Sequence, residues 1–182
     1  MVFSEYTLGG QMFLGAGIEI KPENSAVRFS AMYGRLAKAV QRSAQEGLVF
    51  AEPTYQRIGY GFNLGLGRKK HLVDLIVFKA ADDENSIEVN SDVKVLPEEN
   101  LVAAIHSKHN FYDKLMVEFE YAYSLYTRDK RLQDTDDVNY SFVNNLGGLY
   151  RPNISSDFNK ALTIQSTYQV SRYQLMLKLT EW

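Results

Sequence analysis

The chain has 182 residues, a formal net charge of -2 and no cysteine. This length fits one domain, the near balance of charges gives no electrostatic basis for nucleic-acid binding, and the lack of cysteine excludes disulfides and thiolate chemistry. No apolar run reaches the roughly 18–20 residues of a membrane helix, which excludes helical spans but leaves strand-built barrels open.

Alternation of apolar and polar residues with a period of two is the main pattern, and it predicts β-strands. In chain order the expected strands are 6–20, 26–36, 57–67, 71–80, 100–110, 114–125, 161–171 and 173–181. Several exceed ten residues, against five or six in soluble sheets, whereas a bilayer crossing needs about 9–11. The segment from Leu36 to Glu46 has helix-forming composition and predicts a helical turn within a loop.

The two faces of the predicted strands differ in chemistry. One face of the strands that start at residues 6, 57 and 161 is mostly small and weakly charged, which suits a polar lumen with the apolar face turned to lipid. The residues expected to face lipid are Ile58, Tyr60, Phe62, Leu64, Leu66, Leu115, Val117, Phe119, Tyr121, Tyr123, Leu162, Ile164 and Tyr168. The residues expected to face the lumen are Arg57, Asn63, Glu118, Glu120 and Gln165. The alternative is a soluble sandwich or lipocalin-like barrel whose apolar row faces the core, because the pattern defines two faces but not what each contacts.

Short and long connections alternate along the chain. Short turns are expected near 21–24, 67–70, 110–113 and 171–172, and long loops over 41–54, 81–99 and 128–159. Outer-membrane barrels have this asymmetry, with short periplasmic turns and longer outer loops. The expected fold is an all-β, antiparallel up-and-down transmembrane β-barrel, with about eight strands in a single segment spanning residues 1–182.

Three features predict that these strands belong to a larger barrel. The first connection is short, so an even number of strands would put both termini on the long-loop side, where a complete barrel does not have them. Trp182 is out of phase with the apolar row Leu175, Leu177 and Leu179. The first ten residues also lack the basic and apolar regions of a secretory signal.

Four stretches of the chain resemble uncharacterised outer-membrane β-barrel proteins of the Bacteroidota. They are Arg28–Leu36, Pro53–Gly61, Phe78–Asp83 with Ser86 and Ile87, and Pro97–Val102, and the similarity continues more weakly from Tyr150 to Leu179. The resemblance implies an outer-membrane location and a barrel that continues past this chain. It brings no catalytic residues.

Two acidic clusters fall in the expected long loops and are candidate calcium sites. The candidate ligands are Asp82, Asp83, Asp134, Asp136 and Asp137. Carboxylate oxygens bind Ca²⁺ and would bridge it to lipopolysaccharide phosphates, but the spacing is not that of an EF-hand. The preferred interpretation is that both clusters belong to solvated acidic loops, because runs of like charge are usually exposed to water.

The histidines and the strand glutamates carry weaker signals. His106 and His109 are three apart on a strand and therefore point to opposite faces, while His71 is expected to stand alone and solvated. Glu118 and Glu120 share a face about 7 Å apart, a spacing that any strand supplies. They are expected to belong to a ladder of opposite charges, because charges inside a wall must be paired or hydrated.

No serine-hydrolase, phosphate-loop or zinc-protease motif occurs in the sequence. The expected function is a non-enzymatic integral outer-membrane barrel that acts as a pore, transporter or assembly scaffold, without a cofactor. Its expected partners are membrane lipids, lipopolysaccharide and the outer-membrane assembly machinery, with no nucleic acid, and the oligomeric state stays open. The alternatives are a soluble barrel that binds an apolar ligand and a barrel enzyme that acts on lipids.

Overall fold

A computed structural model describes residues 13–41, 52–68, 70–88, 95–135, 149–170 and 173–181 of the chain. These residues form one sheet of eight strands in the order of the sequence, with every neighbouring pair antiparallel. The strands are β1 (Leu14–Ile20), β2 (Val27–Ala37), β3 (Gln56–Arg68), β4 (His71–Asp83), β5 (Glu99–Phe111), β6 (Leu115–Thr127), β7 (Ser156–Val170) and β8 (Tyr173–Glu181). The predicted all-β, up-and-down antiparallel architecture is confirmed.

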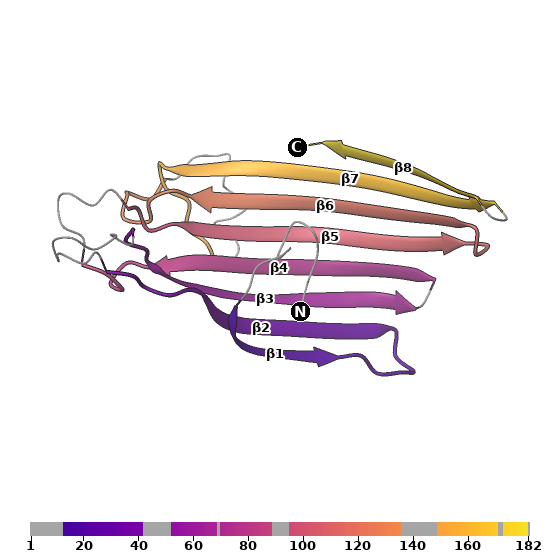
Figure 1. Cartoon of the computed structure of the whole chain (residues 1–182), viewed down its shortest axis with the longest axis horizontal. Helices are drawn as coiled ribbons and strands as arrows, with labels where there is room; N and C mark the ends of the chain where they lie inside the picture. The colour runs from indigo at the N-terminus through magenta and orange to yellow at the C-terminus, as the bar shows by residue number, and fades with distance from the viewer. Residues whose placement is uncertain are drawn as a thin grey trace.

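The sheet is open, because β1 and β8 form its two edges and do not pair with each other in the described residues. The strands lie side by side in Figure 1, with the strand ends that enter the long connections at one side and those that enter the short turns at the other. An open arc is consistent with a section of a larger barrel, in which further strands would complete the closure. The described residues contain no helix long and apolar enough to span a membrane.

The strands extend beyond the alternating pattern at the long-loop end. β4 continues to Asp83 and β7 begins at Ser156, because the backbone ladder pairs polar residues as readily as apolar ones. The first strand is described only from Leu14, so its predicted residues 6–12 lie outside the described part, as does Trp182.

The helical turn predicted for residues 36–46 is wrong where the structure describes it. Leu36 and Ala37 belong to β2, and Val40 forms an isolated bridge with Thr54 through two backbone hydrogen bonds of 2.9 and 3.0 Å. Backbone pairing with a distant segment thus overrides a weak local helix propensity. Residues 42–46 lie outside the described part.

The strand register assigns alternate residues to two faces. Leu64 of β3 lies opposite Phe29 of β2 and Leu75 of β4, and the face that carries this row is here called the apolar face. Asn63 lies opposite Ser30 and Ile76, and the face that carries that row is called the mixed face.

The larger of two buried apolar clusters in the described residues lies on the mixed face. It consists of Met32, Ile76, Phe78, Ala80, Ala104 and Ala122, with Phe13, Leu36 and Ala161 packed against it. Leu36 reaches over β3 because Gly59 has no side chain, and a Cβ there would lie 2.7 Å from Leu36 Cδ1. The mixed face is therefore less uniformly polar than the sequence of β3 and β7 predicted, since β4 contributes Ile76 and Phe78 to it.

Candidate functional site

The apolar face presents large side chains to the outside over most of its extent. Leu64 is 37% exposed, Leu66 is 51% exposed, and similar side chains are exposed on every strand from β1 to β8 except β6, where they are partly buried. All residues predicted to face lipid lie on this face, namely Ile58, Tyr60, Phe62, Leu64, Leu66, Leu115, Val117, Phe119, Tyr121, Tyr123, Leu162, Ile164 and Tyr168. The apolar face is thus a continuous surface built by the whole sheet.

The described segment 149–155, directly before β7, covers the apolar face at its long-loop end. Tyr150 is 1% exposed and packs on Leu101 and Leu125, and its hydroxyl hydrogen-bonds with Thr127. Lys79 Nζ of β4 donates to the carbonyl of Leu149, the residue before Tyr150, at 2.6 Å. The exposed apolar band therefore begins below this covered zone and continues to the short turns.

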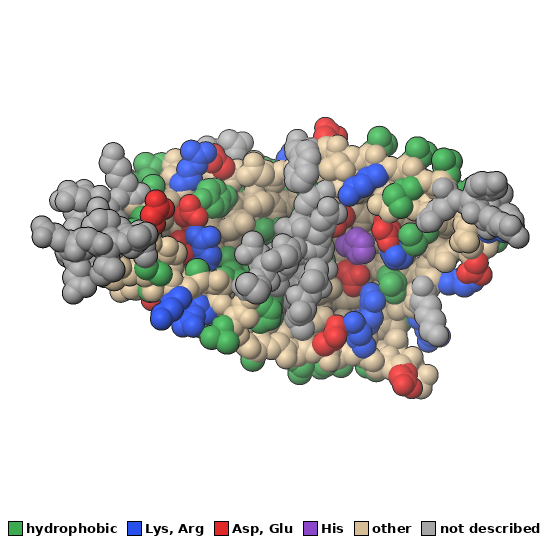
Figure 2. Space-filling view, in the orientation of Figure 1, with side chains coloured by type: hydrophobic (Ala, Val, Ile, Leu, Met, Phe, Trp, Pro, Cys, Tyr) green, Lys and Arg blue, Asp and Glu red, His purple; other side chains and the backbone are tan. Residues whose placement is uncertain are grey.

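A row of ionisable side chains crosses the mixed face nearer the short turns. In register the row reads Arg28 on β2, Asp74 on β4, His106 on β5 and Glu120 on β6, and Gly65 occupies the β3 position between Arg28 and Asp74. Arg28 Nη2 donates to Asp74 Oδ1 at 2.9 Å, and His106 Nδ1 lies 3.6 Å from Asp74 Oδ2. Glu120 is 8% exposed and lies directly opposite His106. Figure 2 shows acidic, basic and histidine side chains gathered over this part of the sheet.

A second charged row runs beside the first. Lys108 of β5 forms an ion pair with Glu118 of β6, and Gln165 of β7 follows in register. The residues predicted to face the lumen, which are Arg57, Asn63, Glu118, Glu120 and Gln165, all lie on the mixed face. Of the expected ladder of opposite charges, this row contains the Lys108–Glu118 ion pair, which forms because the register places Lys108 directly opposite Glu118.

Gly65 makes the Arg28–Asp74 ion pair possible, because the pair joins β2 to β4 across β3. A Cβ at Gly65 would lie 2.4 Å from Asp74 Oδ1 and 2.9 Å from Arg28 Nε. Gly65→Ala is therefore expected to separate the charges and lower the free energy of unfolding by about 1–3 kcal/mol, although Gly→Ala in a strand is otherwise favourable. Denaturant unfolding measures this cost. In the Arg28→Ala/Asp74→Ala background the cost should vanish, and an equal cost there would contradict the explanation.

Arg57 organises the long-loop end of the mixed face. Its Nε and Nη2 donate to the two carboxylate oxygens of Asp82 at 2.7 and 2.9 Å, and its Nη2 also donates to Glu98 at 2.7 Å. Asp82 is 5% exposed and accepts a further hydrogen bond from the Glu98 backbone N–H. Lys130 of the next long loop donates to the Asp82 carbonyl at 2.7 Å. These bonds fasten two long loops to the end of the sheet.

The candidate calcium ligands do not converge in the described residues. Both Asp82 oxygens are bonded to Arg57, whereas Asp83 follows on the opposite face and accepts the Asn85 N–H. Asp134 lies in a different loop, where its backbone forms an isolated β-bridge with Asn153. Asp136 and Asp137 lie outside the described part. The described ranges hold no group of three or more histidine or acidic side chains placed to bind a metal ion.

The loop after β6 contains an ion pair that predicts a response to acid. Arg131 Nε and Nη2 donate to the carboxylate of Asp129 at 2.8 and 2.9 Å, which holds the pKa of Asp129 below its ordinary value. The stabilisation is therefore complete above about pH 4 and is lost as the pH falls through the lowered pKa. A ¹³C NMR titration of the Asp129 carboxyl should show a higher midpoint in Arg131→Gln. An unchanged midpoint would contradict the assignment.

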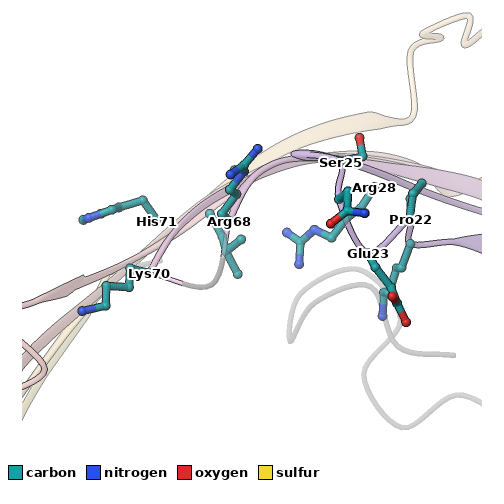
Figure 3. Close-up of a pocket in the computed structure, with 11 residues that line it drawn as sticks. Pro22, Glu23, Ser25, Arg28, Arg68, Lys70 and His71 are labelled. Carbon is teal, nitrogen blue, oxygen red and sulfur yellow. The ribbon is translucent and has the colours of Figure 1, made fainter.

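The short-turn end contains an open hollow of about 810 Å³ between the β1–β2 and β3–β4 turns (Figure 3). Its basic lining residues are Lys21, Arg28, Arg68 and Lys70. Lys21 pairs with Glu19 at 2.6 Å, Lys70 pairs with Asp113 at 2.9 Å, and Arg28 is held by Asp74 as described. Because most of these cations already have carboxylate partners, the hollow is not a dedicated anion site.

His71 does not stand alone, so the sequence-based expectation for it was wrong. It lies directly opposite His109 in the β4–β5 register, with the two Nδ1 atoms 3.2 Å apart. His106 and His109 lie on opposite faces, as their spacing requires. The partner of His71 could not be read from the sequence, because it depends on how β4 and β5 are aligned.

No protein-family model, curated protein or solved structure gives a significant match to this chain. What the chain does must therefore be inferred from the chemistry of its two faces.

Proposed function

We propose that this chain forms a section of the wall of a bacterial outer-membrane β-barrel, with the apolar face against lipid and the mixed face toward the lumen. The apolar face is the observation that carries the proposal, since its large side chains are exposed across the sheet. Soluble proteins rarely expose a contiguous apolar surface beyond a few hundred Å². Contact with hydrocarbon removes that surface from water at no polar cost.

The height of the apolar face supports the proposal. On β6 it carries an apolar or aromatic residue at every second position from Leu115 to Leu125. Ten residue steps span about 34 Å along a strand, which at a tilt of about 40° is a height of about 26 Å. The apolar band of outer-membrane barrels is about 25 Å tall. At its upper limit Leu125 meets Tyr150 instead of being exposed.

The role proposed within this class is a non-enzymatic pore, transporter or assembly scaffold. Ion pairs join different strands on the mixed face, as in Arg28–Asp74 and Lys108–Glu118, which suits a rigid lumen wall. The proposed partners are membrane lipids, lipopolysaccharide beside the long loops, and the assembly machinery that inserts such barrels.

Spin labelling tests which face meets lipid. Because the chain has no cysteine, Phe62→Cys, Leu64→Cys and Asn63→Cys each provide a single labelling site. In protein reconstituted into phospholipid vesicles, nitroxides at 62 and 64 should be more accessible to oxygen than to a water-soluble nickel chelate. The label at Asn63, between them on the mixed face, is the matched control and should not show this preference.

A soluble barrel that encloses an apolar ligand makes the opposite prediction. The protein would then be monodisperse without detergent, and labels at positions 62 and 64 would be shielded from both reagents. That result would replace the membrane proposal with the soluble one.

A further inference from the structure

We propose that His71 and His109 form a zinc-type metal site on the apolar face at the short-turn end of the sheet. The two side chains come from different hairpins, since His71 begins β4 and His109 lies near the end of β5. Their Nδ1 atoms are 3.2 Å apart. The imidazole nitrogen is the protein ligand that zinc and its neighbours in the first transition row most often use.

The backbone explains why the two rings approach each other. Asn110 N–H donates to the Lys70 carbonyl at 2.7 Å, so residues 70 and 110 form a hydrogen-bonded pair. The next pair along an antiparallel ladder is non-hydrogen-bonded, and there the Cα atoms come within about 4.5 Å and the side chains are closest. His71 and His109 occupy that pair. The strands therefore hold both side chains side by side without a bulge.

The nitrogen separation matches a metal-bound pair. Two imidazole nitrogens at about 2.0–2.1 Å from a tetrahedral zinc ion are about 3.3–3.4 Å apart. The observed 3.2 Å needs only a small adjustment. Without metal, one Nδ1 donates to the other, and on binding the donor ring shifts its proton to Nε2 so that both Nδ1 lone pairs face the ion. Water molecules complete the coordination, because the pair supplies two ligands.

The surroundings orient the rings and leave room for a cation. Phe111 packs edge-on against His71, with ring centroids 5.6 Å apart, and also lies beside His109 at 6.2 Å. The neighbouring cation Lys70 is paired with Asp113 at 2.9 Å, which offsets its charge. In Figure 3 the side chain of Arg68, the β3 residue opposite His71, points in a different direction from the His71 ring. A bound ion would join the β3–β4 hairpin to the β5–β6 hairpin.

The test is a Zn²⁺ titration of the full chain in detergent micelles, followed by side-chain ¹⁵N NMR of its three histidines. We expect the Nδ1 signals of His71 and His109 to shift together along one binding curve while those of His106 stay unchanged. His71→Ala and His109→Ala should each weaken binding by at least about tenfold, since loss of even an outer-sphere partner costs that much. His106→Ala, on the other face, is the matched control and should bind as the unaltered chain does.

Thermal unfolding gives a second readout, because a ligand that binds only the folded state raises its stability by an amount that grows with the logarithm of the ratio of ligand concentration to dissociation constant. Zinc should raise the midpoint of the unaltered chain and of His106→Ala but not of His71→Ala. The proposal is overturned if His71 and His109 do not shift at millimolar Zn²⁺, or if His71→Ala retains the unaltered affinity. Lipid contact plays no part in this test, so its outcome is separate from that of the spin-label experiment.

Discussion

Arginine in place of Leu64 is expected to lower the free energy of unfolding from a lipid bilayer by about 2–4 kcal/mol. Leu64 lies in the middle rows of the apolar face, between Phe29 and Leu75, and is 37% exposed. If that face contacts hydrocarbon, the guanidinium of an arginine there must be buried in lipid or the bilayer must deform around it, and both cost free energy. Urea unfolding of the chain folded into phospholipid vesicles measures the difference.

The same substitution at Phe111 is the matched control. Phe111 is on the same face and is 41% exposed, close to the value for Leu64. It lies six residue steps along β5 from Ile105, which is in the row of Leu64, and therefore about 20 Å nearer the short turns. Near the membrane interface arginine costs only about 0–1 kcal/mol. If both variants lost less than about 0.5 kcal/mol, as exposed sites in water do, the lipid-facing assignment would be wrong.

Removal of the Asp82 carboxylate is expected to have the second large effect. Asp82→Ala leaves Arg57 without its two-point partner and frees the Glu98 N–H. The expected loss is about 1.5–3 kcal/mol of unfolding free energy, as for hydrogen bonds to charged groups. It should stay below the 3–5 kcal/mol of a fully buried pair, because the Arg57 side chain is 36% exposed and keeps Glu98 as a partner. Denaturant unfolding measures the loss.

An exposed ion pair at the same end of the sheet is the control for Asp82. Arg128 and Asp157 are 2.6 Å apart, but their side chains are 67% and 47% exposed. Asp157→Ala should therefore cost no more than about 1 kcal/mol. The Asp82 variant should also speed exchange of the Glu98 amide, whose N–H donates to the Asp82 carboxylate. Equal losses at the two sites would show that Arg57 does not fasten the long loops.

The strands and their faces were largely predictable because alternation is a local property. Each side chain of Ile58, Tyr60 and Phe62 follows the last by two residues, so they share a face whatever the rest of the chain does. The same reasoning placed Glu118 and Glu120 on the other face. Composition was the weaker guide: it suggested a helix for residues 36–41, whereas Leu36 and Ala37 belong to β2 and Val40 pairs with Thr54.

The candidate site was less predictable, because its contacts join residues far apart in the chain. His71 and His109 are 38 residues apart, and Arg57 meets Glu98 across 41 residues. A shift of one residue in either register would send these side chains to opposite faces. The burial of Tyr150 depends on a loop that folds back onto Leu101 and Leu125, and no periodic pattern in the sequence signals that contact.

The amino-acid order by itself determined that this protein is an antiparallel sheet with one apolar face and one mixed face, because a period of two acts within each strand. Only the tertiary structure decided which residues meet. In that structure His71 lies opposite His109, and the Arg28–Asp74 ion pair crosses β3 at Gly65. Tyr150 packs on the long-loop end of the apolar face. The physical reason is that register and loop packing are set by the whole sheet at once, through hydrogen bonds and contacts between segments that no local pattern connects.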